Sequence, residues 1–280
     1  MRWPGKKHSN DINGKTPMTM KIATWNVNSI KVRLPHVLDW LNGHRPAVLC
    51  LQELKCEAGN FPLEAVTAAG YHALIAGQKA YNGVALLSLQ PGSDPVIGIP
   101  GFEDPQQRVI AATYGEVRVI SVYCPNGESL TSEKYGYKLR WFAAFRDYLE
   151  ATLMRYPLLV VAGDYNVAPE DRDVYDPVAW KGEVLCSDAE RAAFAALLKL
   201  GLKDSFRLFE QADKSYSWWH YRVNAFKRNM GLRIDHILAS DPLALTCSSC
   251  AIDKGPRALE RPSDHAPVFA EFSDSSSPNS

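Results

Sequence analysis

The chain has 280 residues, enough for one large domain or two small ones with a full hydrophobic core. Lys plus Arg and Asp plus Glu both total 31, so the formal charge is zero and no global field directs the protein toward nucleic acid or membrane. No apolar run reaches about 18 residues and no apolar segment follows the basic N-terminus. The sequence thus favours neither a transmembrane helix nor a signal peptide, and we expect a cytoplasmic protein.

The ends of the chain differ in composition from the rest. We expect residues 1–19 to form a flexible polar lead, residues 20–272 a single domain, and residues 273–280, "SDSSSPNS", a flexible tail. No linker-like break or short repeat interrupts the central part.

Strand and helix patterns alternate along the central part. Residues 21–27 alternate like a strand, and 30–44 carry apolar residues with helical spacing. Residues 46–53 and 157–164 are apolar runs that end in an acid, which is typical of strands buried on both faces. The remaining patterns predict strands at 82–89, 108–114, 117–123, 233–240 and 266–272, a hairpin turn at Gly115-Glu116, and helices at about 137–154 and 188–200. This mixture predicts a mixed-sheet α/β domain with helices outside.

Polar residues fall at or near the ends of these predicted strands. They are Asn26, Glu53, Tyr123, Asp164, Asp235, Asp264 and His265. Because ligand sites in α/β folds gather at strand ends, we expect these side chains to converge.

Glu53 is the first candidate for a metal ligand. A carboxylate that leaves a buried strand is costly unless it is paired or binds a metal, and a hard ion such as Mg²⁺ suits Glu53 with help from Asn26 and Asp264. The alternative is that Glu53 caps a turn or pairs with Lys55. The sequence alone supports both interpretations equally.

The other acids suggest hydrolysis. Asp164 and Asn166 in "AGDYN" lie two apart, on the same side if the segment is extended. Asp235, flanked by isoleucines, would fix the tautomer of His265 and favour its cation if the two meet. No nucleophilic serine lies in a strained elbow motif, so water is the expected nucleophile. Together these residues predict metal-assisted phosphoester hydrolysis.

The motifs around these residues resemble those of a known family. The motifs "WNVNSIKVR", "LQELK", "VYCPNGES", "GDYNVAP", "YSWWHYR", "NMGLRIDHILAS" and "RPSDHAPV" are similar, in order and spacing, to those of the exonuclease III type AP endonucleases of the endonuclease/exonuclease/phosphatase superfamily. The resemblance covers essentially the whole central part. It implies a four-layered α/β sandwich, in which two packed mixed β-sheets are flanked by helices.

The resemblance also implies roles for the polar residues. Glu53 becomes the principal Mg²⁺ ligand, with Mn²⁺ as a substitute ion and Asn26 and Asp264 near the metal. His265, oriented by Asp235, contacts the scissile phosphate. The remaining implied roles concern the water and the phosphate: Asp164 positions or deprotonates the water or protonates the leaving oxygen, Asn166 and Tyr123 hold the phosphate, and Asn28 and Asn126 support nearby contacts.

The implied partner is double-stranded DNA with an abasic site or a blocked 3′ end. The resemblance also implies a monomeric protein that does not bind a membrane. Residues 216–234 are basic and aromatic and contain no acid before Asp235, which suits phosphate contacts through residues such as Arg222. From composition alone, an amphipathic segment at the edge of the core is an equal alternative. By the resemblance, Trp218 and Leu232 form the pocket for an abasic sugar.

Three positions bear on substrate preference. Leu232 stands where some members of the family have Trp, and Ser129 stands near where certain members insert a long basic side chain into the duplex. We expect Leu185 to lie in a loop that faces DNA and to hinder an intact abasic duplex, which favours 3′-end processing. The rival hypotheses are a phosphodiesterase for inositol phosphates or sphingolipids, and a catalytically silent DNA-binding module.

Overall fold

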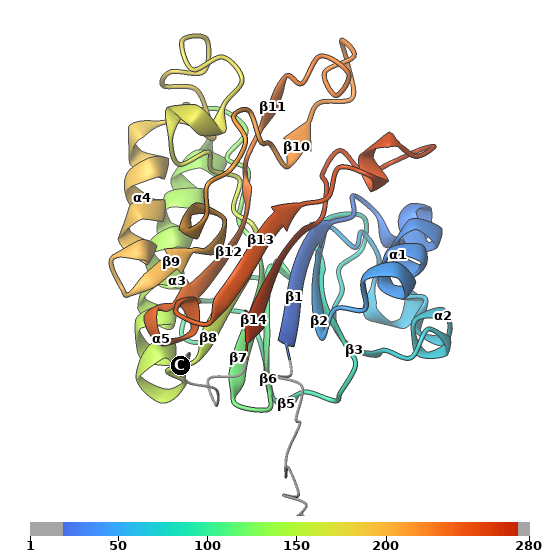
Figure 1. Ribbon diagram of the computed structural model, residues 1–280. Coiled ribbons are helices and arrows are strands. Elements are labelled where there is room, and N and C mark those ends of the chain that lie inside the picture. Colours follow the sequence, from blue (N-terminus) through green and yellow to red (C-terminus); the bar gives the residue numbers. More distant parts are fainter. Residues whose placement is uncertain (1–18, 274–280) are drawn as a thin grey trace, which may run out of the picture.

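The computed structural model describes residues 19–273 (Figure 1). The first strand begins at Thr19 and the last ends at Ser273, each one residue beyond the domain limits expected from the sequence. The remainder of the expected lead and tail lies outside the described residues.

Two mixed six-stranded sheets form the centre of the molecule. The first has the order β13 (Cys247–Ile252), β14 (Val268–Ser273), β1 (Thr19–Asn26), β2 (Val48–Gln52), β4 (Val84–Ser88) and β3 (His72–Ala76). The second has the order β5 (Ser93–Ile97), β6 (Val109–Tyr114), β7 (Val117–Tyr123), β8 (Leu159–Asp164), β12 (Asp235–Ser240) and β9 (Leu202–Asp204). Only β1 with β2 and β7 with β8 pair in parallel. The two parallel pairs therefore lie at the centres of the sheets.

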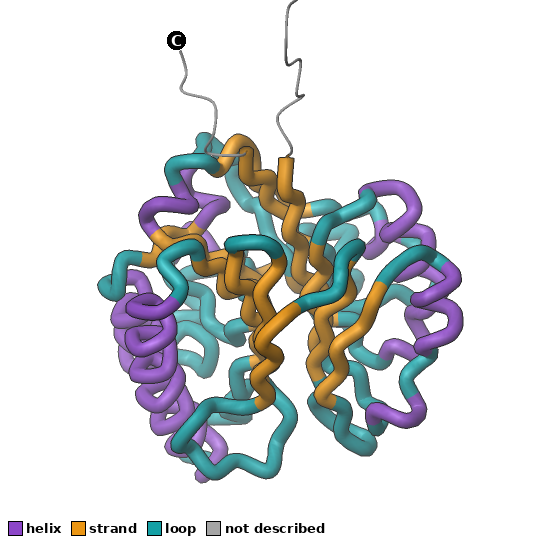
Figure 2. The backbone as a smooth tube through the Cα atoms, turned by 90° about the horizontal axis from the view of Figure 1, so that it is seen from below, coloured by secondary structure: helices purple, strands orange, loops and turns teal. Residues whose placement is uncertain are grey.

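Helices cover the outer faces of both sheets, which makes four layers (Figure 2). The first sheet carries α1 (Ile30–His44) and α2 (Leu63–Ala68), and the second carries α3 (Glu133–Arg155) and α4 (Asp188–Leu198). A short α5 (Asp241–Ala244) follows β12. One buried cluster lies between the sheets and one lies under each helical layer. Within residues 19–273, no helix has the length and apolar content needed to cross a bilayer.

The expected four-layered sandwich is confirmed, and the strands of the two main sheets that were missed are all edge strands. Strands β3, β5, β9 and β13 are the outermost strands of the two sheets. An edge strand is partly solvated and lacks a continuous apolar run; β5, "SDPVI", is mostly exposed. The expected hairpin is present, since Tyr114 pairs with Val117 across Gly115-Glu116. Helix α3 begins earlier than expected because Ser132 caps it by accepting the backbone N–H of Lys134.

Candidate active site

The polar residues at the strand ends gather at one edge of the sandwich, at the top of Figure 1. In the second sheet the register sets Tyr123 beside Asp164, and Asp164 beside Asp235. In the first sheet β1 ends at Asn26 beside the end of β2, and Glu53 follows directly. Both sheets therefore contribute side chains to the same place, as the sequence predicted.

Glu53 pairs with Lys55, as the alternative interpretation of its sequence predicted, and it also points into the site. Its Oε1 accepts hydrogen bonds from Asn26 Nδ2 at 2.9 Å and from the Tyr123 hydroxyl at 3.0 Å, while Oε2 pairs with Lys55 Nζ at 2.9 Å. The backbone of Glu53 has φ 51°, a left-handed conformation that is costly for a residue with a side chain. The turn after β2 thus points this carboxylate into the site at some cost in backbone energy.

His265 lies between two buried carboxylates. Its Nδ1 lies 2.9 Å from Asp235 Oδ2, and its Nε2 lies 3.7 Å from Asp164 Oδ2. Ser217 Oγ donates to Asp235 Oδ2 at 2.6 Å and so fixes the far side of that acid. Burial alone would lower the pKa of His265, but the charges of Asp235 and Asp164 outweigh it and raise the pKa to about 10. The imidazole is therefore a cation at neutral pH.

Asp164 is held by donors and also destabilised by burial. Its oxygens accept Asn26 Nδ2 and the backbone N–H of Asn166, both at 2.9 Å. Burial and the nearby charge of Asp235 raise the pKa of Asp164 above its ordinary value, although the charge of His265 opposes them. The carboxyl group is therefore close to exchanging a proton under physiological conditions.

Asn166 departs from the expected extended geometry. Its φ of 50° turns the chain immediately after β8, so Asp164 and Asn166 do not lie on one side of a strand. The Asn166 backbone N–H donates to the Asp164 carboxylate within this turn. Asn126 Nδ2 then donates to Asn166 Oδ1 at 3.0 Å, which connects the loops after β7 and β8.

The site can accept a cation. Glu53, Asp164 and His265 each offer a ligand atom, and these atoms lie within 4.8 Å of one another. The two carboxylates suit a hard divalent ion such as Mg²⁺, whereas a cationic imidazole is not a ligand for such an ion. The carboxylate oxygens are thus the groups that fit a metal.

Asn26 and Asp264, both expected near the metal, already have hydrogen-bond partners at the site. Asn26 Oδ1 accepts the backbone N–H of Asn28, and Asn26 Nδ2 donates to Glu53 and to Asp164. Asn26 therefore lies beside both carboxylates and orients them. Asp264 lies outside the three-residue cluster: Asn28 Nδ2 donates to its Oδ1 at 2.9 Å and Trp218 Nε1 to its Oδ2 at 3.1 Å.

The two residues expected to form the sugar pocket lie on a small hairpin, where Leu232 is fully buried and Trp218 is half-buried. Strands β10 (Trp218–Trp219) and β11 (Gly231–Leu232) pair Trp218 with Leu232. Leu185 is only 5% exposed and belongs to the same apolar cluster as both side chains. Its backbone is left-handed, with φ 74°. The Leu185 side chain therefore lies behind the hairpin.

The basic loop is only partly available to DNA. Arg222 is exposed, as expected, and Ser129 is exposed on the loop after β7. Arg233 is one of the basic residues of the 216–234 segment. It is buried and pairs with Asp173 and Asp204. Its charge is compensated within the protein, so it is unavailable for phosphate contacts.

Comparison with known proteins matches residues 23–265 to the Endonuclease/Exonuclease/phosphatase family. The chain belongs to this family. It is 39% identical to an exodeoxyribonuclease III of Haemophilus influenzae over 90% of this chain and 100% of that protein. A 3′ phosphatase from Neisseria bound to a product DNA hairpin matches with TM-score 0.89 and 49% identity over 90% of this chain and 99% of that one. An AP endonuclease from Archaeoglobus fulgidus matches with TM-score 0.87 and 41% identity over the same shares. The chain is an enzyme of the exonuclease III and AP endonuclease type.

Several side chains of the family site were not assigned from the sequence. Lys55 Nζ donates to Asn28 Oδ1 at 2.5 Å besides pairing with Glu53. The Arg108 guanidinium lies 4.8 Å from the centroid of the Tyr123 ring and donates to the Tyr123 carbonyl. Lys55 lies in the matching motif "LQELK", and Arg108 begins the strand pattern at 108–114, so both positions carried a signal. For Ser217 the only signal in the sequence was its position directly before Trp218.

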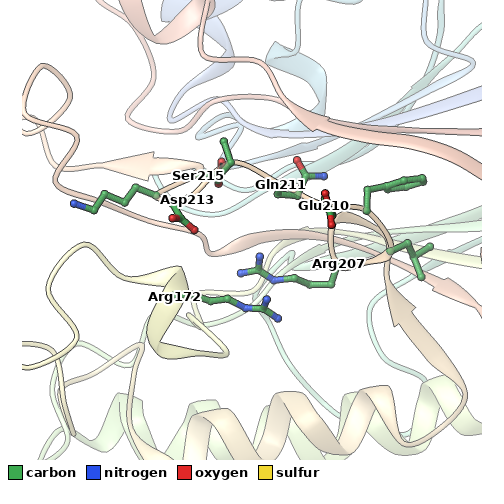
Figure 3. A pocket seen from close by; sticks show the side chains of 10 residues that line it. Arg172, Arg207, Glu210, Gln211, Asp213 and Ser215 are labelled. Atoms are coloured by element: carbon green, nitrogen blue, oxygen red, sulfur yellow. Dashed lines mark hydrogen bonds between the residues drawn. The ribbon is translucent and has the colours of Figure 1, made fainter.

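The surface has two hollows, and they differ in whether they include residues of the site. A hollow of about 770 Å³ reaches Tyr123 and Asn126 and continues over Arg108 and Tyr81. A second, of about 530 Å³, contains none of the expected site residues (Figure 3). Arg172 and Arg207 lie side by side in it, and they pair with Glu170 and Asp173. Only the first hollow extends the site.

Proposed function

We propose that the chain is a Mg²⁺-dependent DNA repair nuclease that hydrolyses phosphoesters at abasic sites and at blocked 3′ ends, with a bias toward 3′ ends, and that it acts as a monomer. One observation carries the hydrolytic part. A cationic His265 lies between buried Asp235 and Asp164, beside Glu53, where both sheets end. A fixed cation next to a proton-exchanging acid is suited to stabilising a phosphate while water attacks it.

The protein side chains divide the chemistry between them. Asp235 holds the tautomer of His265 through Nδ1, which leaves Nε2–H, on the Asp164 side of the ring, to contact the phosphate. Asp164 exchanges the proton, either with the attacking water or with the leaving oxygen. Burial and the charges of Glu53 and Asp164 raise the pKa of Tyr123 well above its ordinary value, so its hydroxyl remains a donor. With the amide of Asn166, it supplies neutral donors for the phosphate.

The carboxylate of Glu53 would hold the metal ion, with Mn²⁺ able to replace Mg²⁺. A bound divalent ion would supply positive charge that offsets the developing negative charge on the phosphate oxygens. Asn26 orients Glu53 toward that position, and Lys55 pairs with the other oxygen of the same carboxylate. Asp264 keeps Asn28 and Trp218 in place at the border of the site.

DNA is the proposed partner because the relatives act on DNA or its ends by name, and because exposed cationic residues such as Arg222, Lys227 and Arg228 border the site. Backbone contacts release counterions, so turnover should weaken steeply as salt rises. A phosphodiesterase for inositol phosphates or sphingolipids would lack that dependence on a DNA substrate. A silent DNA-binding module would keep its affinity after Asp164→Asn and have no turnover to lose.

The bias toward 3′ ends rests on Leu185. Its side chain lies in one apolar cluster with Trp218 and Leu232. By supporting these two residues from behind, its bulk would limit how far they can yield to a sugar held within a continuous duplex. A frayed 3′ end approaches without that constraint. Replacing Leu185 by Gly would enlarge the pocket and suits the left-handed backbone.

The test uses two labelled duplexes, one with an internal abasic analogue and one nicked with a 3′-phosphate, each with Mg²⁺ and with chelator. The wild type should process the nicked duplex faster, chelator should stop both reactions, and Leu185→Gly should raise abasic incision relative to 3′-phosphate removal. Leu243→Ala, an equally buried position at the other end of the second sheet, controls for lost packing and should leave the ratio unchanged. Equal wild-type rates on both duplexes would remove the bias, and no reaction on either would remove the proposed substrate.

A further inference from the structure

A buried ion pair lies behind the site, outside every group discussed above. Lys138 on α3 and Glu190 on α4 are both 0% exposed, and Lys138 Nζ lies 2.5 Å from Glu190 Oε1. Burying two charges is expensive, and apolar side chains of the same size would pack two helices as well. The pair therefore needs an explanation beyond the packing of α3 on α4.

The remaining contacts of Lys138 all fall on loops of the site. Its Nζ donates to the Asn166 carbonyl at 2.6 Å and to the Asn126 carbonyl at 3.1 Å. These are the two asparagines whose side chains bond to each other and whose loops follow β7 and β8. The stem of Lys138 also fills the space beside Gly127, where a Cβ would lie 3.3 Å from Lys138 Cδ. One ammonium group thus holds both amide-bearing loops.

Glu190 extends the same connection to the substrate pocket. Its Oε1, the oxygen that meets Lys138, also accepts the backbone N–H of Leu185 at 3.0 Å. Its Oε2 accepts the backbone N–H and the hydroxyl of Ser187. The Leu185 carbonyl in turn accepts the backbone N–H of Ala168, two residues after Asn166. The contacts form a closed chain from Asn166 through the ion pair to Leu185 and back.

Both ends of this chain have left-handed backbone. Asn166 has φ 50° and Leu185 has φ 74°, conformations that a residue with a side chain adopts only when its surroundings hold it there. Lys138 holds the carbonyl of the first, and Glu190 holds the N–H of the second. Both left-handed residues thus depend on contacts with the same ion pair.

We propose that Lys138 and Glu190 are positioning residues that couple the phosphate-side amides to the Leu185 wall, so that this pair sets both the rate and the choice between abasic sites and 3′ ends. The inference rests on the proposed function and adds a substrate-selecting role for two residues that touch no substrate.

The main variants are Lys138→Met and the milder Glu190→Gln, which keeps an oxygen for Lys138 and Leu185. The matched control is Arg118→Met. Arg118 is also a buried cation and donates to a backbone carbonyl, that of Asp94, but it lies at the opposite end of β7 from Tyr123. All three variants should lower the melting temperature, so kinetics are measured where each remains folded.

For Lys138→Met we expect kcat on the 3′-phosphate duplex to fall about 10- to 100-fold with little change in KM, as for loss of groups that orient a site. The ratio of abasic incision to 3′-phosphate removal should change as well, with a smaller change in the same direction for Glu190→Gln. Arg118→Met should alter neither quantity. A Lys138→Met kcat within twofold of the wild type, or an equal loss in Arg118→Met, would overturn the proposal.

A second measurement needs no substrate. Amide hydrogen exchange should accelerate in residues 164–168 and 183–187 in the Lys138→Met and Glu190→Gln variants, and remain at the wild-type rate there in Arg118→Met. Unchanged exchange in these segments would contradict the coupling. If the wild type itself cleaves neither duplex, the proposed function fails while the exchange data still decide whether the pair holds the loops. If Lys138→Met does not fold, Glu190→Gln gives both readouts.

Discussion

This protein has two clusters of charged side chains, and they differ in the ratio of acidic to basic groups. The arginine cluster pairs two acids with two bases: Asp173, Asp204, Arg207 and Arg233. The site cluster sets three carboxylates against two cationic groups: Glu53, Asp164 and Asp235 with His265 and Lys55. Buried charges are tolerated when compensated. The first cluster is complete as it stands, whereas the second has an excess of negative charge that a divalent cation would offset.

The pKa values follow the same division. The charge of Arg233 and contacts with His236 lower the pKa of Asp204 despite its burial. In the site cluster, burial and a neighbouring carboxylate raise the pKa of Asp164. An acid with a lowered pKa stabilises the fold, and one with a raised pKa weakens it. Removing one acid from the site cluster should therefore lower activity and leave stability unchanged or higher. Removing one acid from the arginine cluster should lower stability and leave activity unchanged.

The largest expected effect is on activity in the site cluster. Asp164→Asn removes the proton-exchanging group, so kcat on the 3′-phosphate duplex should fall by about 10²- to 10⁴-fold. Because the lost charge is an unfavourable one, the free energy of unfolding should stay equal or rise. Steady-state kinetics and urea unfolding of the same preparation measure both, and a marked loss of stability would place Asp164 with the structural acids.

The next effect is on stability in the arginine cluster. Asp204→Asn leaves Arg233 with a single carboxylate partner, and breaking a buried pair in this way costs about 3–5 kcal/mol. The expected result in urea unfolding is a lower midpoint with an unchanged slope. Activity per folded molecule should stay near the wild-type value. A tenfold loss of kcat at full folding would mean that the two clusters are not separate in function.

Tyr123→Phe should have a smaller effect. The variant loses the donor to Glu53 Oε1 and retains the ring that packs under Arg108. We expect a decrease of about tenfold in kcat/KM, equivalent to about 1.4 kcal/mol, and no change in the melting temperature beyond a few degrees. Kinetics at saturating and limiting substrate separate the two constants, and wild-type kinetics would exclude a donor role.

The smallest effect is on the acid limb of stability. Because the folded pKa of Asp204 lies below its unfolded value of about 3.9, its contribution is present above that pH and is lost as pH falls below it. The wild type should therefore lose stability more steeply than Asp204→Asn below about pH 4, by up to about 1.4 kcal/mol per pH unit. Unfolding curves at several acidic pH values measure the slopes, and parallel slopes would mean that Asp204 titrates alike in both states.

The sequence predicted central strands and site acids well, for one reason. Buried strands require continuous apolar runs, and an acid at the end of such a run is conspicuous; Glu53 and Asp164 were found in this way. The edge strands and the β10–β11 hairpin were missed because their residues are partly solvated or few. The family resemblance supplied Trp218 and Leu232, which composition did not distinguish from core.

Other features depend on three-dimensional detail that no local pattern encodes. The left-handed turn at Asn166, the amide direction of Asn26 and the inward packing of Leu185 each result from hydrogen bonds or contacts between distant segments. The burial of Arg233 is similar, because its partner Asp173 lies 60 residues away. The sequence therefore located the basic residues of this loop correctly. It could not show which of them, such as Arg233, are buried and unavailable to DNA.

The most direct test of the charge imbalance is calorimetric titration of Mg²⁺ into the wild type, Glu53→Gln and Asp204→Asn, without DNA. The account predicts that the wild type and Asp204→Asn bind the ion with similar affinity, and that Glu53→Gln binds it at least about tenfold more weakly. Equal binding by the wild type and Glu53→Gln would contradict the assignment of the site cluster as the metal site.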